Sequence, residues 1–224
     1  MPPPIYLDHN ATTPVAAEVL SAMLPYLERH FGNPSSSHAY GVPAHEAVER
    51  ARAQVAALLG CEPDTIVFTA SGSEANNLAI KGMTVDRRRE GEHIITTAIE
   101  HPAVLNACRY LERRHGYRLT IAAVNHSGLV DPEEIRSAIQ PGTGLISVMH
   151  ANNEVGTLQP IQEIAALARE CGITVHTDAA QSVGKVWATV DELGWTCSRW
   201  LATSCTRRKE SARSTFGPGH SSSR

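Results

Sequence analysis

Hydrophobic and polar residues alternate along this chain in blocks typical of a layered α/β fold. From residue 66 onward, short runs rich in Val, Ile and Thr are separated by longer stretches with helical periodicity. The runs cover residues 66–70, 93–99, 119–124, 145–151 and 173–180. Because they are apolar nearly throughout, rather than at every second position, they predict strands covered on both faces. Strands that alternate with helices in this way predict an α/β fold with a mainly parallel sheet.

Helix starts are indicated where a capping residue precedes proline, at Thr13 and at Asp131. The side-chain oxygen of such a residue accepts hydrogen bonds from the free amides of the first turn, and proline suits the backbone of that turn. Before the first strand, the pattern predicts helices over about 15–30 and 43–59. Residues 32–37 are all Gly, Asn, Pro or Ser, which predicts a loop between these helices.

The chain changes character after Gly194. Residues 195–224 show neither helix nor strand periodicity, carry six Lys and Arg against one acid, and end in serines. Such a composition is typical of disordered segments. We therefore expect residues 1–194 to form the domain and residues 195–224 to be a disordered tail.

Composition limits the classes of function that need to be considered. The 224 residues, 42% hydrophobic and 19% charged, suffice for one sizeable domain. A net charge of -3 and a pI near 6.4 give no reason to expect nucleic acid or a membrane surface as a partner. The N-terminus lacks the features of a secretory signal, so we expect a cytoplasmic protein. The five cysteines show no CxxC or zinc spacing, and we expect neither a metal site nor disulfides.

Polar residues that follow the predicted strands are the candidates for chemistry, because ligands of open α/β sheets bind beyond the carboxyl ends of the strands. The first strand is followed by Ser71-Gly72-Ser73-Glu74, with a helix expected to begin near Ala75. Small residues and free amides at a helix N-terminus can bind an anion such as phosphate. A plain capped turn is the alternative interpretation.

The next two candidates are weaker when each is taken alone. His101 follows the second strand at a helix entrance, where an imidazole could stack on a planar ring or transfer protons, or could simply be a surface or capping residue. Asn152 and Asn153 follow the fourth strand, where their amides could bind a ring substituent or form a turn.

Asp178 is the sharpest of the four candidates, because it ends an apolar strand. An unpaired buried carboxylate is costly, so we expect a cationic partner. The protonated ring nitrogen of a cofactor is one such partner, and a structural salt bridge or a metal ion is the alternative.

The residues and the order of these motifs resemble those of the cysteine desulfurases over residues 5–194. These enzymes, together with the selenocysteine lyases, are a branch of the class V, fold-type I enzymes that depend on pyridoxal 5'-phosphate (PLP). The matching motifs are YLDHNATTP (6–14), GNPSSSH (32–38), SEANN (73–77), EHPAVL (100–105), HANNEVG (150–156) and HTDAAQSVGK (176–185). The resemblance implies the large domain of the fold-type I transferases, here incomplete and without the small C-terminal domain.

The resemblance also implies a role for each candidate residue. The turn matching Gly72 and Ser73 binds the PLP phosphate in that family. The residue matching His101 stacks on the ring and transfers protons, and Asp178 matches the partner of the ring nitrogen. The residues matching Asn153 and Gln181 lie near the ring oxygen. The four isolated signals thereby become one predicted PLP site.

The implied reaction removes sulfur from L-cysteine, giving L-alanine and an enzyme persulfide for iron-sulfur clusters or thiolated tRNA. The implied partners are a second subunit, in a homodimer, and a sulfur acceptor or iron-sulfur scaffold protein.

One catalytic element of the family is missing from this chain. Soon after the segment matching residues 190–194, the family has a Ser-Gly-His-Lys motif whose lysine forms the Schiff base with PLP. None of the three lysines here, Lys81, Lys185 and Lys209, lies in such a motif. The loop with the persulfide-forming cysteine is absent as well.

The codons of residues 195–219 can be reread from one base earlier. That frame can spell VDLLSVAGHKLYAPKGVGALYVRPG, in which the lysine codon spans Thr203 and Ser204. We therefore predict that one base has been lost and that the product is truncated and inactive. Two alternatives stay open: a selenocysteine lyase, which shares these motifs, and a non-catalytic fragment that pairs with an intact subunit.

Overall fold

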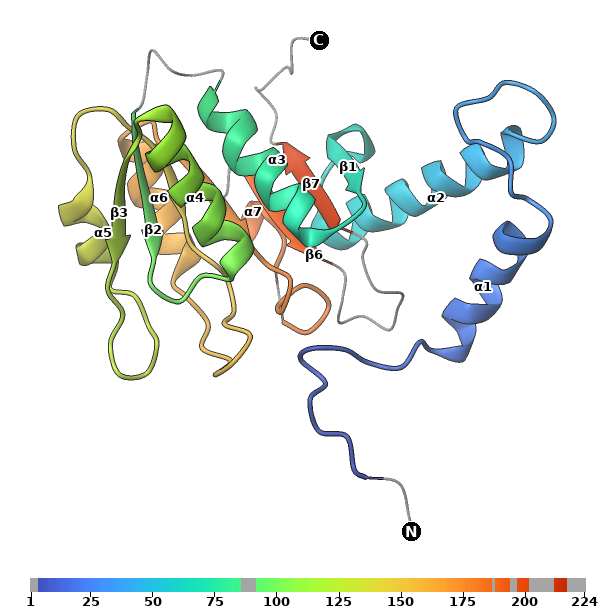
Figure 1. Ribbon diagram of the computed structural model, residues 1–224, viewed down its shortest axis with the longest axis horizontal. Coiled ribbons are helices and arrows are strands. Elements are labelled where there is room, and N and C mark those ends of the chain that lie inside the picture. The colour runs from blue at the N-terminus through green and yellow to red at the C-terminus, as the bar shows by residue number, and fades with distance from the viewer. Residues whose placement is uncertain (1–3, 86–91, 187, 194–196, 202–211, 217–224) are drawn as a thin grey trace.

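The computed structural model describes residues 4–85, 92–186, 188–193, 197–201 and 212–216. In these ranges, helices cover both faces of one sheet, which gives three layers (Figure 1). The predicted α/β fold with a mainly parallel sheet is thereby confirmed. None of the helices in the described ranges is long and apolar enough to cross a membrane.

The sheet has seven strands in the order β1-β7-β6-β5-β4-β2-β3. Strands β3, β2, β4, β5 and β6 pair in parallel, whereas β7 is antiparallel to both of its neighbours, β6 and β1. The strands are β1 (Ile66–Thr69), β2 (His93–Thr97), β3 (Arg118–Ala122), β4 (Thr143–Ser147), β5 (Thr174–Asp178), β6 (Cys197–Leu201) and β7 (Ala212–Phe216). All five predicted strands are present, and each ends before the apolar run does. The residues beyond these ends form the turns that carry the polar candidates.

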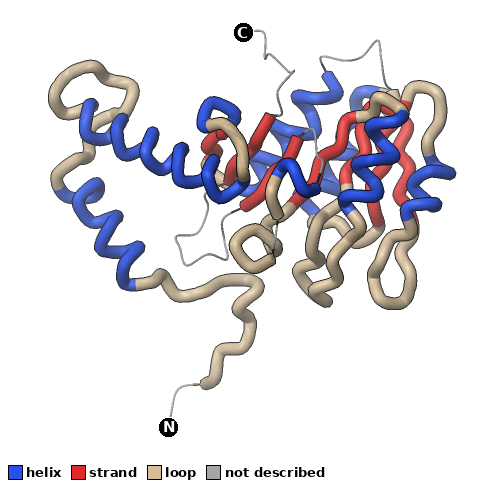
Figure 2. The backbone as a smooth tube through the Cα atoms, turned by 180° about the vertical axis from the view of Figure 1, so that it is seen from behind, coloured by secondary structure: helices blue, strands red, loops and turns tan. Residues whose placement is uncertain are grey.

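The helical elements of the described ranges are α1 (Ala17–Glu28), α2 (Val42–Leu59), the 3-10 turn η1 (Pro63–Thr65), α3 (Gly72–Val85), α4 (Pro102–His115), α5 (Pro132–Ala138), α6 (Ile161–Glu170) and α7 (Val190–Leu193). Helix α1 has no buried residue and lies away from the sheet (Figure 1). Helices α3 and α4 cover one face, seen toward the viewer in Figure 1. Helices α2, α5, α6 and α7 cover the other face, which Figure 2 shows from behind.

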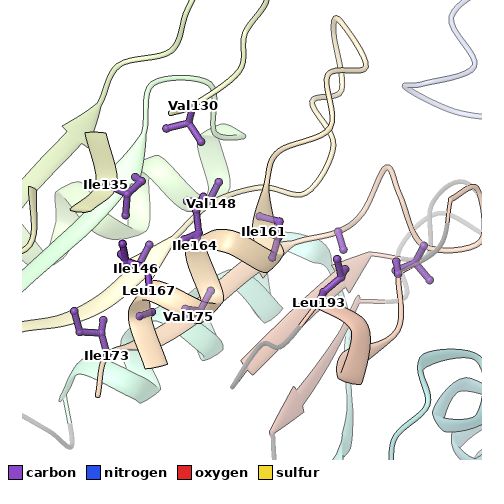
Figure 3. Close-up of a cluster of buried hydrophobic side chains, with 14 of the residues drawn as sticks. Val130, Ile135, Ile146, Val148, Ile161, Ile164, Leu167, Ile173, Val175 and Leu193 are labelled. Atoms are coloured by element: carbon purple, nitrogen blue, oxygen red, sulfur yellow. The ribbon is translucent and has the colours of Figure 1, made fainter. Parts of the chain in front are cut away.

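The larger core lies between the sheet and α5, α6 and α7. In Figure 3, Ile146 and Val175 point from the sheet toward Ile164 and Leu167 of α6, and Ile135 of α5 closes one side. Full burial of each such side chain contributes about 1.5–3 kcal/mol. A smaller cluster on the opposite face joins α3 and α4 to β2 and β4. The two clusters fix the central strands, and therefore the edge where they end.

Two predicted helix starts differ from the structure. Helix α1 begins at Ala17, after the uncapped Ala16, and the Thr13 hydroxyl has no hydrogen-bond partner among the described residues. Helix α3 begins at Gly72 rather than near Ala75, because the Ser71 hydroxyl accepts a hydrogen bond from the Glu74 amide and caps the first turn. At the third start, Asp131 caps α5 as predicted, accepting from the Glu133 amide.

The segment after Gly194 also differs from the expectation of a disordered tail. Residues 197–201 form β6, parallel to β5, and residues 212–216 form β7 between β6 and β1. These residues show no strand periodicity, so pairing with the existing sheet, rather than a local pattern, defines these strands. The rest of 195–224 lies outside the described residues.

Candidate active site

A cavity of about 650 Å³ opens at the carboxyl edge of the sheet, beside the ends of β1, β2, β4 and β5. Its wall includes all six residues predicted from sequence: Gly72, Ser73, His101, Asn153, Asp178 and Gln181. Asp8, Asn10 and Ala11 of the N-terminal segment complete one side. The volume is in the range of small-molecule sites.

The first turn of α3 gives the cavity an anion-binding end. The hydroxyl of Ser71 caps the helix by accepting a hydrogen bond from the Glu74 amide at 3.1 Å. In return, Glu74 Oε2 accepts a hydrogen bond from the Ala70 amide at 2.7 Å. These bonds fix the turn, while the amides of Gly72 and Ser73, at the start of the helix, have no acceptor within it. Because the positive end of the helix dipole adds to these donors, the turn suits a phosphate group.

The opposite wall presents a buried carboxylate at the end of β5. Asp178 is 6% exposed, and its Oδ1 accepts from the Ala180 amide at 3.1 Å. Its Oδ2 accepts from Asn76 Nδ2 at 3.0 Å. Of the alternatives for its cationic partner, a salt bridge to a protein group is not seen: among the residues whose side chains the structure describes (4–84, 92–186, 188–190 and 193), no Lys, Arg or His forms an ion pair with Asp178. The partner for its charge is therefore expected from a ligand.

Asn76 connects these two ends of the cavity. It lies on α3 one helical turn after Gly72, so both residues are on the same side of the helix. Only 1% of Asn76 is exposed, and its hydrogen bond to Asp178 joins α3 to β5. The separation between the anion-binding turn and the carboxylate is thereby set by one helix.

His101 combines the two roles considered for it. Its Nδ1 accepts from the Ala103 amide at 3.1 Å, so the ring caps α4, and the same ring lines the cavity. With Nδ1 occupied as an acceptor, the proton of the neutral ring is on Nε2. The capping bond fixes the ring at the mouth of the cavity, where it can face a planar ligand.

A residue of the N-terminal segment links Asn153 to Gln181. Asn10 Nδ2 donates to the Asn153 carbonyl at 3.1 Å, and the Asn10 carbonyl accepts from Gln181 Nε2 at 3.2 Å. The Asn153 side chain donates to Glu154 Oε1 at 2.7 Å. Through Asn10, a turn of the N-terminal segment therefore joins the chain after β4 to the chain after β5 at the cavity wall.

Glu100 is a buried acid next to His101. Its Oε1 accepts from the Thr97 hydroxyl at 2.7 Å and from the Met149 amide at 2.8 Å. Its Oε2 has no partner among the described residues. Burial raises the pKa of Glu100 to about 8; the two hydrogen bonds oppose this increase, and the charge of Asp178 adds to it.

Sequence reasoning missed two residues that shape the site, Asn10 and Asn76, whereas Asn152 was a candidate and forms the turn that was one of its two expected roles. Asn152 Nδ2 donates to the Ile99 carbonyl at 3.1 Å, and its Oδ1 accepts from the amides of Glu154 and Val155. Asn10 and Asn76 lie within motifs of the family resemblance, which was the available signal. Asparagine alone gives no indication of a partner distant in sequence.

The lysines of the described ranges have other contacts. Lys81 Nζ lies 4.2 Å from the centre of the Tyr110 ring. Lys185 Nζ donates to Gln181 Oε1 at 2.9 Å, outside the cavity wall. Lys209 lies outside the described residues. In the described ranges, no cluster of three His, Cys, Asp or Glu side chains could hold a metal ion.

The residues present fit PLP. The first turn of α3 matches its phosphate, the buried Asp178 carboxylate matches a protonated ring nitrogen, and His101 can face the ring. These three features line the same cavity. The roles of the individual residues toward PLP remain predictions.

Comparison with known proteins gives consistent matches. The family model described as aminotransferase class-V matches residues 5–197. "Cysteine desulfurase IscS" of Dictyoglomus turgidum is 48% identical over 190 residues, which are 85% of this chain and 48% of that protein. "Cysteine desulfurase" of Homo sapiens is 48% identical over 191 residues, which are 85% of this chain and 42% of that protein. The chain thus spans about half the length of the curated relatives it matches.

Solved structures match the fold as well. The structure titled "SspA in complex with cysteine" has a TM-score of 0.90 at 41% identity, covering 94% of this chain and 60% of that one. A "NIFS-LIKE PROTEIN" has a TM-score of 0.92 at 33% identity, covering 96% and 60%.

Fold and site together define the large domain of a fold-type I PLP enzyme. The chain belongs to the aminotransferase class-V family.

Proposed function

We propose that this chain is a form of a PLP-dependent cysteine desulfurase that keeps the cofactor-binding wall of the active site but lacks the amine needed for turnover. The observation that carries the proposal is the buried Asp178, which lines the cavity and forms no ion pair with any residue whose side chain the structure describes. L-Cysteine is the proposed substrate of the intact enzyme. The relatives named as cysteine desulfurases and the neighbour titled as a complex with cysteine support that choice.

In the proposed site each residue holds one part of the cofactor. Bound PLP supplies an electron-withdrawing ring. The amides of Gly72 and Ser73 hold the phosphate, Asp178 keeps the ring nitrogen protonated, and His101 stacks on the ring. Asn153 and Gln181 contact the ring oxygen. His101, with its proton on Nε2, is placed to exchange a proton with a bound substrate.

The missing lysine motif supports the proposed loss of activity. In the frame one base earlier, the codons of β6 spell LLSVA and those of β7 spell GALYV, both apolar strand patterns. In the shifted frame, the lysine codon spans the Thr203 and Ser204 codons, shortly after Leu201, where β6 ends. Strand β6 is parallel to β5, the strand that ends at Asp178. A lysine encoded there would belong to the sheet edge that carries the other site residues.

A homodimer, a cytoplasmic location and a sulfur acceptor or iron-sulfur scaffold partner complete the proposal. The names of the relatives are the support for the last of these.

Restoring the frame tests this function. One base inserted at the Gly194 codon should give a protein that releases alanine from L-cysteine, while the 224-residue chain releases none. L-Selenocysteine is assayed in parallel, and a strong preference for it would favour the selenocysteine lyase alternative. A frame-restored protein that is folded, binds PLP and acts on neither substrate would contradict the proposal.

A further inference from the structure

Glu100 occupies a position between the two turns that carry His101 and Asn153. It precedes His101 directly, in the turn after β2. Its Oε1 accepts from the Met149 amide, which lies just after β4 and before Asn153. The same oxygen accepts from Thr97, the last residue of β2. One carboxyl group therefore connects the ends of two adjacent strands.

Neighbouring contacts extend this connection toward Asp178. Asn152 Nδ2 donates to the Ile99 carbonyl at 3.1 Å, a second bond between the same two turns. The His150 amide donates to the Asp178 carbonyl at 3.0 Å, which joins the turn after β4 to the end of β5. The chain segments that carry His101, Asn153 and Asp178 are thus joined by hydrogen bonds into one unit, and Glu100 lies within it.

The carboxyl group itself does not reach the cavity. Glu100 is 7% exposed and is not part of the cavity wall formed by His101, Asn153 and Asp178. It cannot contact a ligand there, so any effect on the ligand must pass through the residues that it holds. Glu100 is buried and forms no ion pair with any residue whose side chain the structure describes, so its neutral form is favoured. The neutral acid still offers Oε1 as an acceptor and avoids the cost of burying a charge.

We propose that Glu100 is a positioning residue, whose buried carboxyl group ties the His101 turn to the chain after β4 and so sets His101 and Asn153 around the PLP ring. This inference rests on the proposed PLP site. It assigns Glu100 a role in cofactor geometry beyond the stability that its hydrogen bonds provide.

The test uses the full 224-residue chain and three variants. Glu100→Gln keeps a carbonyl acceptor for Thr97 and Met149, whereas Glu100→Met keeps similar volume and removes the acceptor. Thr84→Val is the matched control, because it removes a buried hydroxyl that bonds only within α3. PLP affinity, the circular dichroism induced in bound PLP and hydrogen exchange of the Met149 amide are measured for each.

Glu100→Gln should resemble the unaltered chain in all three measurements. Glu100→Met should bind PLP about tenfold more weakly, as expected when a buried donor loses its partner. It should also change the induced dichroism and speed exchange at Met149. Thr84→Val should lower the melting temperature without changing the affinity or the dichroism.

A folded Glu100→Met variant with rapid Met149 exchange but unchanged PLP affinity and dichroism overturns the positioning role. If that variant does not fold, Thr97→Val, which removes one of the two donors, decides in its place: a smaller loss of affinity supports the role and no loss overturns it. Failure of the unaltered chain to bind PLP contradicts the proposed function, and the positioning role falls with it. Hydrogen exchange of the Met149 amide, compared between the unaltered chain and Glu100→Met, then still shows whether Glu100 holds the turn after β2 to the chain after β4.

Discussion

Asn76 Nδ2 lies 3.0 Å from Asp178 Oδ2, although the two residues are 102 positions apart in the sequence. This bond holds the carboxylate at a fixed place relative to the first turn of α3. It is the contact that relates the proposed phosphate end of the cavity to the proposed ring-nitrogen end.

Replacement of Asp178 should weaken PLP binding strongly. Asp178→Ala removes the charge opposite the ring nitrogen, and hydrogen bonds to charged groups contribute about 1.5–3 kcal/mol, so affinity should fall by roughly 10- to 100-fold. Asp178→Asn, which keeps the shape, should show a similar loss if charge is the cause. Asp131→Ala is the control, since Asp131 caps α5 away from the cavity. Equal affinities for the Asp178 and Asp131 variants would contradict the assigned role.

A negative charge at the start of α3 should discriminate between PLP and pyridoxal. Gly72→Asp places a carboxylate in the first turn, where it is compatible with the helix dipole but repels a phosphate. We expect PLP affinity to fall while pyridoxal affinity changes little. Gly82→Asp is the matched control, because a side chain at Gly82 would meet nothing within 4 Å. Equal losses for both ligands would mean that the phosphate is not bound at this turn.

The sequence predicted the strands better than the contacts between them. Continuous apolar runs identified β1 to β5 because burial on both faces requires such runs. The sequence predicted a cationic partner for Asp178 but not its hydrogen bond from Asn76, because a contact between residues so far apart leaves no local pattern. Likewise, β6 and β7 follow from pairing with the sheet, and their own residues gave no signal.

Stability should fall between pH 4.5 and 8 because of Glu100. The folded-state pKa of Glu100 is raised from 4.5 to about 8, so over this interval the unfolded chain releases a proton that the folded chain retains. The contribution is full below pH 4.5 and is lost as the pH rises through the folded pKa, by up to about 1.4 kcal/mol per pH unit.

Comparison of the unaltered chain with Glu100→Gln isolates this effect. Burial lowers the pKa values of His93 and His150, and these residues act in the opposite direction, destabilising the fold as pH falls through 6.5. The unfolding free energies of both chains, measured with denaturant at several pH values, should therefore differ less at low pH than at high pH. A constant difference in unfolding free energy from pH 4.5 to 8 would rule out the raised pKa.

Cys108 should resist thiol reagents in the folded chain. Burial raises its pKa to about 12, with the charge of Glu100 adding to the increase, so almost no thiolate is present near neutral pH. Cys171 is exposed and serves as the internal control. Brief alkylation followed by peptide mass spectrometry should find Cys171 modified and Cys108 unmodified unless the chain is first unfolded. Equal modification of both in the native chain would contradict the burial.

Borohydride reduction in the presence of PLP, followed by peptide mass mapping, tests most directly whether this chain keeps the cofactor site but has lost its lysine. The 224-residue chain should bind PLP reversibly and yield no stoichiometric pyridoxyl-lysine. The frame-restored protein should carry the pyridoxyl group on the lysine encoded across the Thr203 and Ser204 codons. Stoichiometric labelling of Lys81, Lys185 or Lys209 in the 224-residue chain would contradict the proposal.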